Sequence, residues 1–130
     1  MDSALAEKLR RVARKQTVLL THYGRKSGKP FEVTIWFATD GEYVYLSTAN
    51  VNRHWVYNVK KTPRVKLSIG GELFAGEARY LSDPAERHRA IALVKRKYWP
   101  FRPFVAFAQL LARLGIMKDS VGSFEVTLHP

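Results

Sequence analysis

The chain has 130 residues, of which 46% are hydrophobic and 12% aromatic, enough for one domain with a buried core. It contains no cysteine, which excludes disulfides, zinc–thiolate sites, iron–sulfur clusters and a thiolate nucleophile. The formal net charge of +11 predicts an anionic partner, such as nucleic acid, an acidic lipid surface or a phosphorylated small molecule.

The apolar runs of the chain are too short for a signal peptide or a membrane span. The early run Val18–Leu20 is far shorter than a signal-peptide core. The longest late stretch without charge, residues 103–112, falls well below the roughly 20 residues that cross a bilayer. We therefore expect a cytoplasmic protein, at most peripheral at the inner face of the membrane.

The first predicted element is a basic amphipathic helix over residues 3–15. Leu5, Leu9 and Val12 fall on one helical face, and lysine and arginine side chains fall on the other. The pattern indicates a helix that docks through its apolar face and leaves a cationic face in solvent.

Three strands are predicted next, over residues 17–23, 31–39 and 42–48. The first is rich in β-forming residues, and the second has apolar side chains at every second position. Asp40-Gly41 is a strong hairpin signal between the second strand and the third.

The middle of the chain predicts a short helix followed by another hairpin. The helix covers residues 52–61 and is stopped by Pro63. The hairpin pairs residues 64–70 with residues 72–82, and Gly76 within its second strand indicates a β-bulge.

A clear helix start follows at Asp83, a predicted N-cap with Pro84 at the first helical position and Glu86 three residues after the cap. This helix is expected to run to about Tyr98, where a proline-containing segment interrupts it. A second apolar helix over residues 104–114 and a last strand over residues 123–129 complete the pattern.

Six short strands joined by turns predict a mainly β fold with helices (α+β). We expect a single domain over residues 1–130, built as a small antiparallel barrel with flanking helices. A parallel sheet is not expected, because hairpin-length turns cannot connect parallel neighbours.

The chain offers few groups for catalysis of its own. Its four histidines show no metal-ligand spacing, so no metal site is expected, and no serine lies in a nucleophile elbow. Any chemistry would then belong to a bound cofactor, which the protein has only to hold, cover and place beside a substrate.

The segment GRKSGK, residues 24–29, is chemically suited to hold a phosphate. Its two glycines allow a tight turn, Ser27 can donate a hydrogen bond, and Arg25, Lys26 and Lys29 supply charge-assisted bonds. The glycine spacing is not that of a Walker loop. From these residues alone, the segment is either a solvated hairpin turn or a phosphate-binding loop.

A second polar cluster follows the third predicted strand. Small and polar residues at the strand end precede Arg53, Trp55 and Asn58 in the short helix. Trp55 and Val59, four residues apart, either pin this helix to the barrel or form part of a site.

The segments TVLLTHYGRKSGKPFEVTIWF, YLSTANVNRHWVYNVKKTPRV and GEARYLSDPAER together resemble the deazaflavin-dependent nitroreductase family. These are split β-barrel proteins related to pyridoxamine-phosphate-oxidase-like flavin binders. The resemblance implies a six-stranded antiparallel split β-barrel and a cofactor that is coenzyme F420, a deazaflavin carrying phosphate and oligoglutamate, or otherwise FMN. Members commonly carry arginine and proline where this chain has Phe31 and Thr34.

The resemblance also implies which residues bind the cofactor, in four groups. The phosphate-binding loop corresponds to Arg25, Lys26, Ser27 and Lys29, and the strand lining the ring corresponds to Ile35, Trp36 and Phe37. The strand end beside the reactive side of the ring corresponds to Ser47, Thr48, Ala49 and Asn50. The short helix near the cofactor's tail corresponds to Arg53, Trp55 and Asn58.

Candidates for contact with substrate lie at two places. Ser47 and Tyr98 are the candidate catalytic residues, which would place the acceptor or relay a proton. Tyr98 and Trp99, at the break before Pro100, are candidates for a hydrophobic lid over the substrate.

With this resemblance, the sequence predicts an oxidoreductase similar to the members of that family, which transfers a hydride from reduced F420 to a small unsaturated acceptor such as an enone, a quinone or a nitro compound. One alternative is an FMN-binding split barrel, and another is a non-enzymatic basic barrel that binds nucleic acid or anionic lipid. The cations are spread along the chain rather than gathered with aromatic residues, so no specific nucleic acid is expected. Expected partners are a second copy of the chain and, weakly, an anionic membrane surface.

Overall fold

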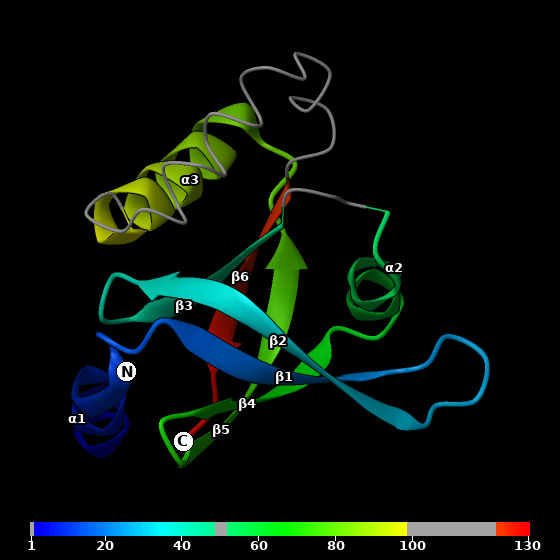
Figure 1. Ribbon diagram of the computed structural model, residues 1–130, viewed down its shortest axis with the longest axis horizontal. Helices are drawn as coiled ribbons and strands as arrows, with labels where there is room; N and C mark the ends of the chain where they lie inside the picture. The colour runs from blue at the N-terminus through cyan, green and yellow to red at the C-terminus, as the bar shows by residue number, and fades with distance from the viewer. Residues whose placement is uncertain (1, 49–51, 99–121) are drawn as a thin grey trace.

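The computed structural model describes residues 2–48, 52–98 and 122–130, in which six strands close into a barrel flanked by three helices (Figure 1). The strands are β1 (Thr17–Tyr23), β2 (Pro30–Thr39), β3 (Tyr43–Thr48), β4 (Arg64–Ile69), β5 (Glu72–Tyr80) and β6 (Gly122–Leu128). Their order around the barrel is β1-β2-β3-β6-β5-β4, and every neighbouring pair is antiparallel. The predicted α+β fold with a six-stranded antiparallel barrel is confirmed.

The three helices are α1 (Ser3–Val12), α2 (His54–Lys61) and α3 (Pro84–Tyr98). The side chain of Asp2 caps α1 by accepting hydrogen bonds from the amides of Ala4 and Leu5. The predicted helix ran to residue 15, but α1 ends sooner, because hydrogen bonds from Ala13 to Arg10 and from Lys15 to Val12 tighten the chain into turns. None of the helices described is long and apolar enough to cross a membrane.

The predicted start of α3 is confirmed by its cap. The Asp83 carboxylate accepts a hydrogen bond of 3.1 Å from the Glu86 amide, which satisfies a backbone donor that the first helical turn leaves free. The helix is described as far as Tyr98. The predicted break after it and the predicted helix over residues 104–114 lie outside the described residues.

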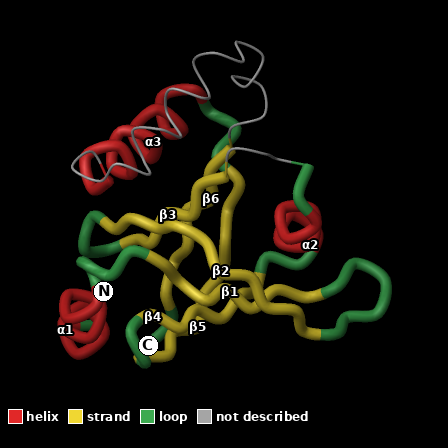
Figure 2. Tube along the Cα trace, in the orientation of Figure 1, coloured by secondary structure: helices red, strands yellow, loops and turns green. Residues whose placement is uncertain are grey.

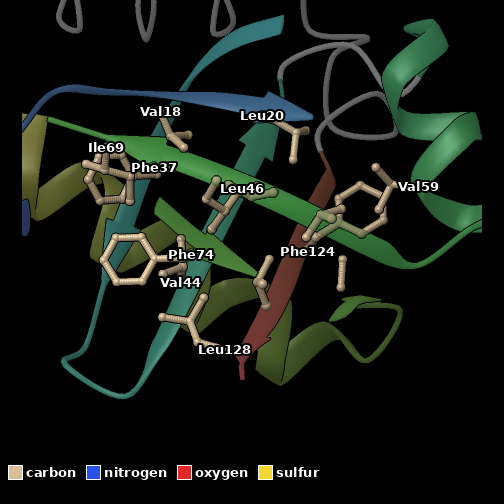
Figure 3. Packing of buried hydrophobic residues seen from close by; sticks show 14 of the residues in the cluster. Val18, Leu20, Phe37, Val44, Leu46, Val59, Ile69, Phe74, Phe124 and Leu128 are labelled. Carbon is tan, nitrogen blue, oxygen red and sulfur yellow. The ribbon is translucent and has the colours of Figure 1, made fainter. Parts of the chain in front are cut away.

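The core fills the barrel (Figure 3), and the same cluster of buried residues continues under two of the helices. Side chains at alternate positions of the strands point inward, among them Val18, Leu20, Leu46 and Phe124, and all four are almost completely buried. Helix α1 adds Leu5, Leu9 and Val12 to this cluster, and α2 adds Trp55, Val56 and Val59. The apolar face of each helix is therefore used for packing on the barrel.

Gly76 of β5 does not form the predicted bulge. The register of β5 runs without an offset against both neighbours, from Arg64↔Glu77 to Ile69↔Glu72 on one side and from Gly76↔Leu128 to Tyr80↔Phe124 on the other. A Cβ atom at Gly76 would lie 2.4 Å from the carbonyl oxygen of Thr127. The glycine is explained by the close approach of β6, which leaves no room for a side chain.

Strands β2 and β3 pair over only part of their length. Phe37–Thr39 pair with Val44–Leu46, whereas the first part of β2 pairs with β1 alone and the end of β3 pairs with β6. Strand β1 in turn meets β4 only over Leu19–Thr21. The far end of the β1–β2 hairpin therefore has no strand on either flank, and its loop extends away from the barrel on the side where α2 lies (Figure 2).

Candidate functional site

The GRKSGK segment forms a closed turn between β1 and β2. The Gly24 amide donates to the Lys29 carbonyl at 2.9 Å, and the Gly28 amide donates to the Gly24 carbonyl at 3.0 Å. Gly28 has φ +70°, a conformation that residues with a Cβ atom adopt at a cost. The Ser27 hydroxyl oxygen accepts from the Lys29 amide at 3.2 Å, so its proton remains able to donate to a ligand.

Helix α2 holds this turn from one side. A guanidinium nitrogen of Arg25 donates to the His54 carbonyl at 3.2 Å and to the Asn58 side-chain oxygen at 3.1 Å. The Lys61 ammonium group donates to the Arg25 carbonyl at 3.0 Å. Both the backbone and the side chain of Arg25 are thus anchored to one helix.

Asn58 links Arg25 to a buried histidine. Its amide nitrogen lies 3.0 Å from Nδ1 of His22, and the two side chains are only 6% and 5% exposed. The ring of His22 stacks on Phe31 with 5.9 Å between ring centres. Burial lowers the pKa of His22 below its ordinary value, because desolvation disfavours the charged imidazolium.

A pocket of about 720 Å³ lies between the turn and α2. Its walls carry three cations, Arg25, Lys26 and Arg53, against one carboxylate, Glu32. The other lining residues are His22, Gly24, Ser27, Phe31, Val33, His54, Trp55 and Asn58. The pocket therefore brings together the two sequence clusters that the resemblance assigned to one cofactor, and its charge suits an anionic group.

The predicted tail-binding residues have a structural role as well. Trp55 is buried and packs against Phe124, with 5.6 Å between ring centres, and this contact holds α2 on the barrel. Trp55 also lines the pocket. Lys29, predicted as a fourth phosphate ligand, does not belong to the pocket lining.

The predicted ring-lining residues of β2 do not form one wall, because successive residues of a strand face opposite sides. Ile35 packs against the main core and Phe37 is completely buried within it. Trp36 lies on the other face, where it packs with Ala38 and Val94 beneath α3. The assignment of these three residues to the ring stays a prediction.

Ser47, the first candidate catalytic residue, lies near the end of β3. Its hydroxyl group is 2.9 Å from that of Ser123, its cross-strand partner on β6, and Thr48 follows it opposite Gly122. Tyr98 is the last residue of α3. Ala49, Asn50, Trp99 and the side chain of Tyr98 lie outside the described residues, so their predicted roles stay predictions.

Sequence reasoning missed the apolar and histidine side of the pocket. His22, Phe31 and Val33 line it, yet none was assigned to the site. His22 could have been found, because it continues the alternation of the buried residues Val18 and Leu20 and is therefore an inward-facing histidine. In the part of the chain that is described, no group of His, Asp and Glu side chains could hold a metal ion.

Outside the pocket, Lys97 of α3 packs against β2. Its ammonium group donates to the Phe37 carbonyl at 2.9 Å and lies 3.6 Å from the centre of the Phe37 ring. Burial lowers the pKa of Lys97 to about 8 from an ordinary value of 10.5.

This shift predicts a pH-dependent stability. The folded protein holds the Lys97 proton less tightly than the unfolded chain does, so the free energy of unfolding should rise as the pH is raised from about 8 towards 10.5. Urea denaturation across this range should show that rise in the wild type and lose it in Lys97→Gln. Lys95→Gln, which changes an exposed lysine of the same helix, should keep it; an unchanged pH profile in Lys97→Gln would contradict the assignment.

The fold and the site together define a class of protein: a small antiparallel barrel with a cationic pocket between its first hairpin and a short helix. Residues 3–103 match the family model described as F420H(2)-dependent quinone reductase, and the chain belongs to this family. It is an oxidoreductase whose cofactor is coenzyme F420.

Solved structures show the same fold. A conserved hypothetical protein from Mycobacterium tuberculosis is 21% identical, with a TM-score of 0.70 over 100% of this chain and 82% of that one. A structure described as an F420-H2 dependent reductase is 23% identical, with a TM-score of 0.64 over 85% of this chain and 93% of that one. A putative pyridoxamine 5'-phosphate oxidase from Listeria innocua is 16% identical, with a TM-score of 0.69 over 97% and 94% of the two chains.

Proposed function

We propose that this F420-dependent reductase transfers a hydride from reduced F420 to a small unsaturated acceptor, such as an enone, a quinone or a nitro compound. The observation that carries the proposal is the convergence of Arg25, Lys26 and Arg53 on one pocket beside the closed turn. When bound, the reduced deazaflavin supplies the hydride, and the protein has to hold the cofactor and place the acceptor.

The residues of the pocket fit the anionic part of this cofactor. Arg25 is held in place by His54 and Asn58, so it can meet a phosphate with little loss of side-chain freedom. Lys26 and the Ser27 hydroxyl group add a second cation and a donor from the same turn. The pocket volume also falls within the usual range of small-molecule sites, about 300–1,000 Å³.

Ser47 and Tyr98 are proposed to serve the acceptor. Reduction of the acceptor takes up one proton besides the hydride, and a hydroxyl group within hydrogen-bond distance could relay it. The Ser47 hydroxyl is oriented by its contact with Ser123, which is completely buried. Trp99 is proposed as a hydrophobic cover for the acceptor.

Two further partners are proposed, each with a direct test. One is a second copy of the chain, supported by a similar solved structure described as a domain-swapped dimer, and light scattering of the purified protein would detect it. The other is an anionic membrane surface, attracted by the exposed cations Arg10 and Arg14 near α1. Because the apolar face of α1 is buried in the core, such binding would be electrostatic and lost at high salt.

The cofactor assignment is tested by titrating the purified protein separately with F420, FMN and a random DNA duplex at physiological salt. We expect F420 to bind most tightly, because the pocket cations meet its phosphate and the wider basic surface meets its glutamate tail. FMN offers one phosphate and no such tail, so it should bind more weakly and lose less affinity as salt rises. The duplex should bind loosely, with the steep salt dependence of counterion release.

Two results would count against the proposal. Tighter binding of FMN would mean that the glutamate tail contributes less than the fit of the ring and phosphate. Tight, sequence-selective DNA binding without retention of either cofactor would contradict the assignment of the pocket to a small-molecule cofactor.

A further inference from the structure

The hydrogen bonds around Asn58 define the protonation of His22. A guanidinium group can only donate, so the atom of Asn58 that meets Arg25 at 3.1 Å must be the side-chain oxygen. The amide nitrogen of Asn58 is then the atom 3.0 Å from Nδ1 of His22, and this nitrogen can only donate. Nδ1 of His22 must therefore accept, which places the ring proton of the neutral imidazole on Nε2.

The same logic excludes a doubly protonated His22 from this arrangement. With a proton on Nδ1, the imidazolium and the Asn58 amide nitrogen would present two donors to each other. Rotating the amide would bring its oxygen to His22, but its nitrogen would then face the donors of Arg25. Because His22 and Asn58 are both buried, water cannot relieve the first conflict at low cost, and in the second the buried amide nitrogen of Asn58 would be left without an acceptor.

We propose that His22 is a positioning residue, which in its neutral form orients Asn58 and through it holds the Arg25 guanidinium beside the anion-binding pocket. His22 and Asn58 are 36 residues apart in sequence and come from β1 and α2, so the link also couples the turn to the helix that flanks it. The link itself depends only on the geometry, whereas its consequence for cofactor affinity rests on the proposed phosphate site.

The charged groups around His22 do not oppose this protonation state. The charged residues lining the same pocket are Arg25 and Lys26 on the turn, Arg53 before α2 and the single carboxylate Glu32 of β2, and His54 of α2 is the other titratable side chain among them. Desolvation already lowers the pKa of His22. The neutral form is thus the one expected near neutral pH.

The first test uses NMR of the ligand-free protein. At neutral pH, the nitrogen chemical shifts of His22 should show an unprotonated Nδ1 and a protonated Nε2. As the pH falls and His22 titrates, the guanidinium resonances of Arg25 should change from a restrained to a freely exchanging side chain. Two results would overturn the proposal: a proton on Nδ1 of His22 at neutral pH, or guanidinium resonances of Arg25 that do not change as His22 titrates.

The second test compares variants of His22, one of which keeps a hydrogen-bond acceptor for Asn58 and one of which removes it. His22→Asn can place an oxygen near the position of Nδ1 and cannot titrate, so Arg25 should stay restrained at low pH. His22→Leu removes the acceptor, and F420 should bind about tenfold more weakly, the size expected when one charge-assisted contact loses its preorganisation. His54→Gln changes the other histidine of the pocket and should keep the pH response of Arg25. Arg25 contacts His54 through the backbone carbonyl, which this substitution does not change.

The outcomes separate the positioning link from the proposed function. Equal Kd values for F420 in His22→Leu and the wild type would overturn the role of the link in binding. Failure of the wild type as well as the variants to bind F420 would refute the phosphate site, while the NMR of the ligand-free protein would still decide whether His22 holds Arg25. If His22→Leu does not fold, comparison of the wild type with His22→Asn across pH decides the question, because ionisations of the cofactor are shared by both proteins.

Discussion

Reversing Lys26 to glutamate is expected to weaken F420 binding by about 3 kcal/mol, because a charge-assisted hydrogen bond contributes roughly 1.5–3 kcal/mol and the new carboxylate repels the phosphate. Lys26 is exposed and lines the pocket. Fluorescence titration with F420 measures the change in Kd, and the difference should shrink as salt rises.

The same variant should fold normally. Exposed charges contribute little to stability, so the thermal midpoint of the cofactor-free protein should barely move. Lys95→Glu is the matched control, because it makes the same change in net charge on α3, outside the pocket. Lys29→Glu should have an intermediate effect, since Lys29 belongs to the turn but does not line the pocket. Equal affinity in Lys26→Glu and the wild type would show that the turn is only a solvated hairpin.

Replacing Gly76 with alanine should destabilise the barrel by about 2–4 kcal/mol, as expected for an overpacked and closely paired site. The added Cβ atom would lie 2.4 Å from the Thr127 carbonyl oxygen and 2.9 Å from a methyl carbon of Val126. The nearer atom belongs to the backbone of β6, so relief requires the two strands to separate and their hydrogen bonds to lengthen. The reduced freedom of the unfolded chain offsets only about 0.4–1 kcal/mol of this cost.

Urea denaturation of the cofactor-free protein measures this effect, and Gly71→Ala is the control. Gly71 lies in the β4–β5 turn with φ +86°, and a Cβ atom there would meet nothing within 4 Å. Its substitution should therefore cost only the strain of a left-handed conformation, about 1–2 kcal/mol. A Gly76→Ala variant as stable as the wild type would mean that β5 and β6 approach less closely than described here.

Local signals in the sequence determined most of the secondary structure. The cap at Asp83, the turn at Asp40-Gly41 and the alternation of apolar residues in β1 act over a few residues, so they can be recognised without knowing the rest of the fold. The basic turn and the polar residues of α2 were likewise recognisable as candidates for one cofactor site, from their residue types and from the resemblance to a known family.

Only the tertiary structure decided what these residues contact. The reading of Gly76 as a bulge was wrong, because the residue is small to admit the backbone of β6, which comes from the other end of the chain. The sequence also placed His22 in no site, although docking of α2 against β1 joins it to Asn58 and Arg25. Hydrogen bonds between distant segments depend on the relative placement of whole elements, and no pattern within one segment reports that placement.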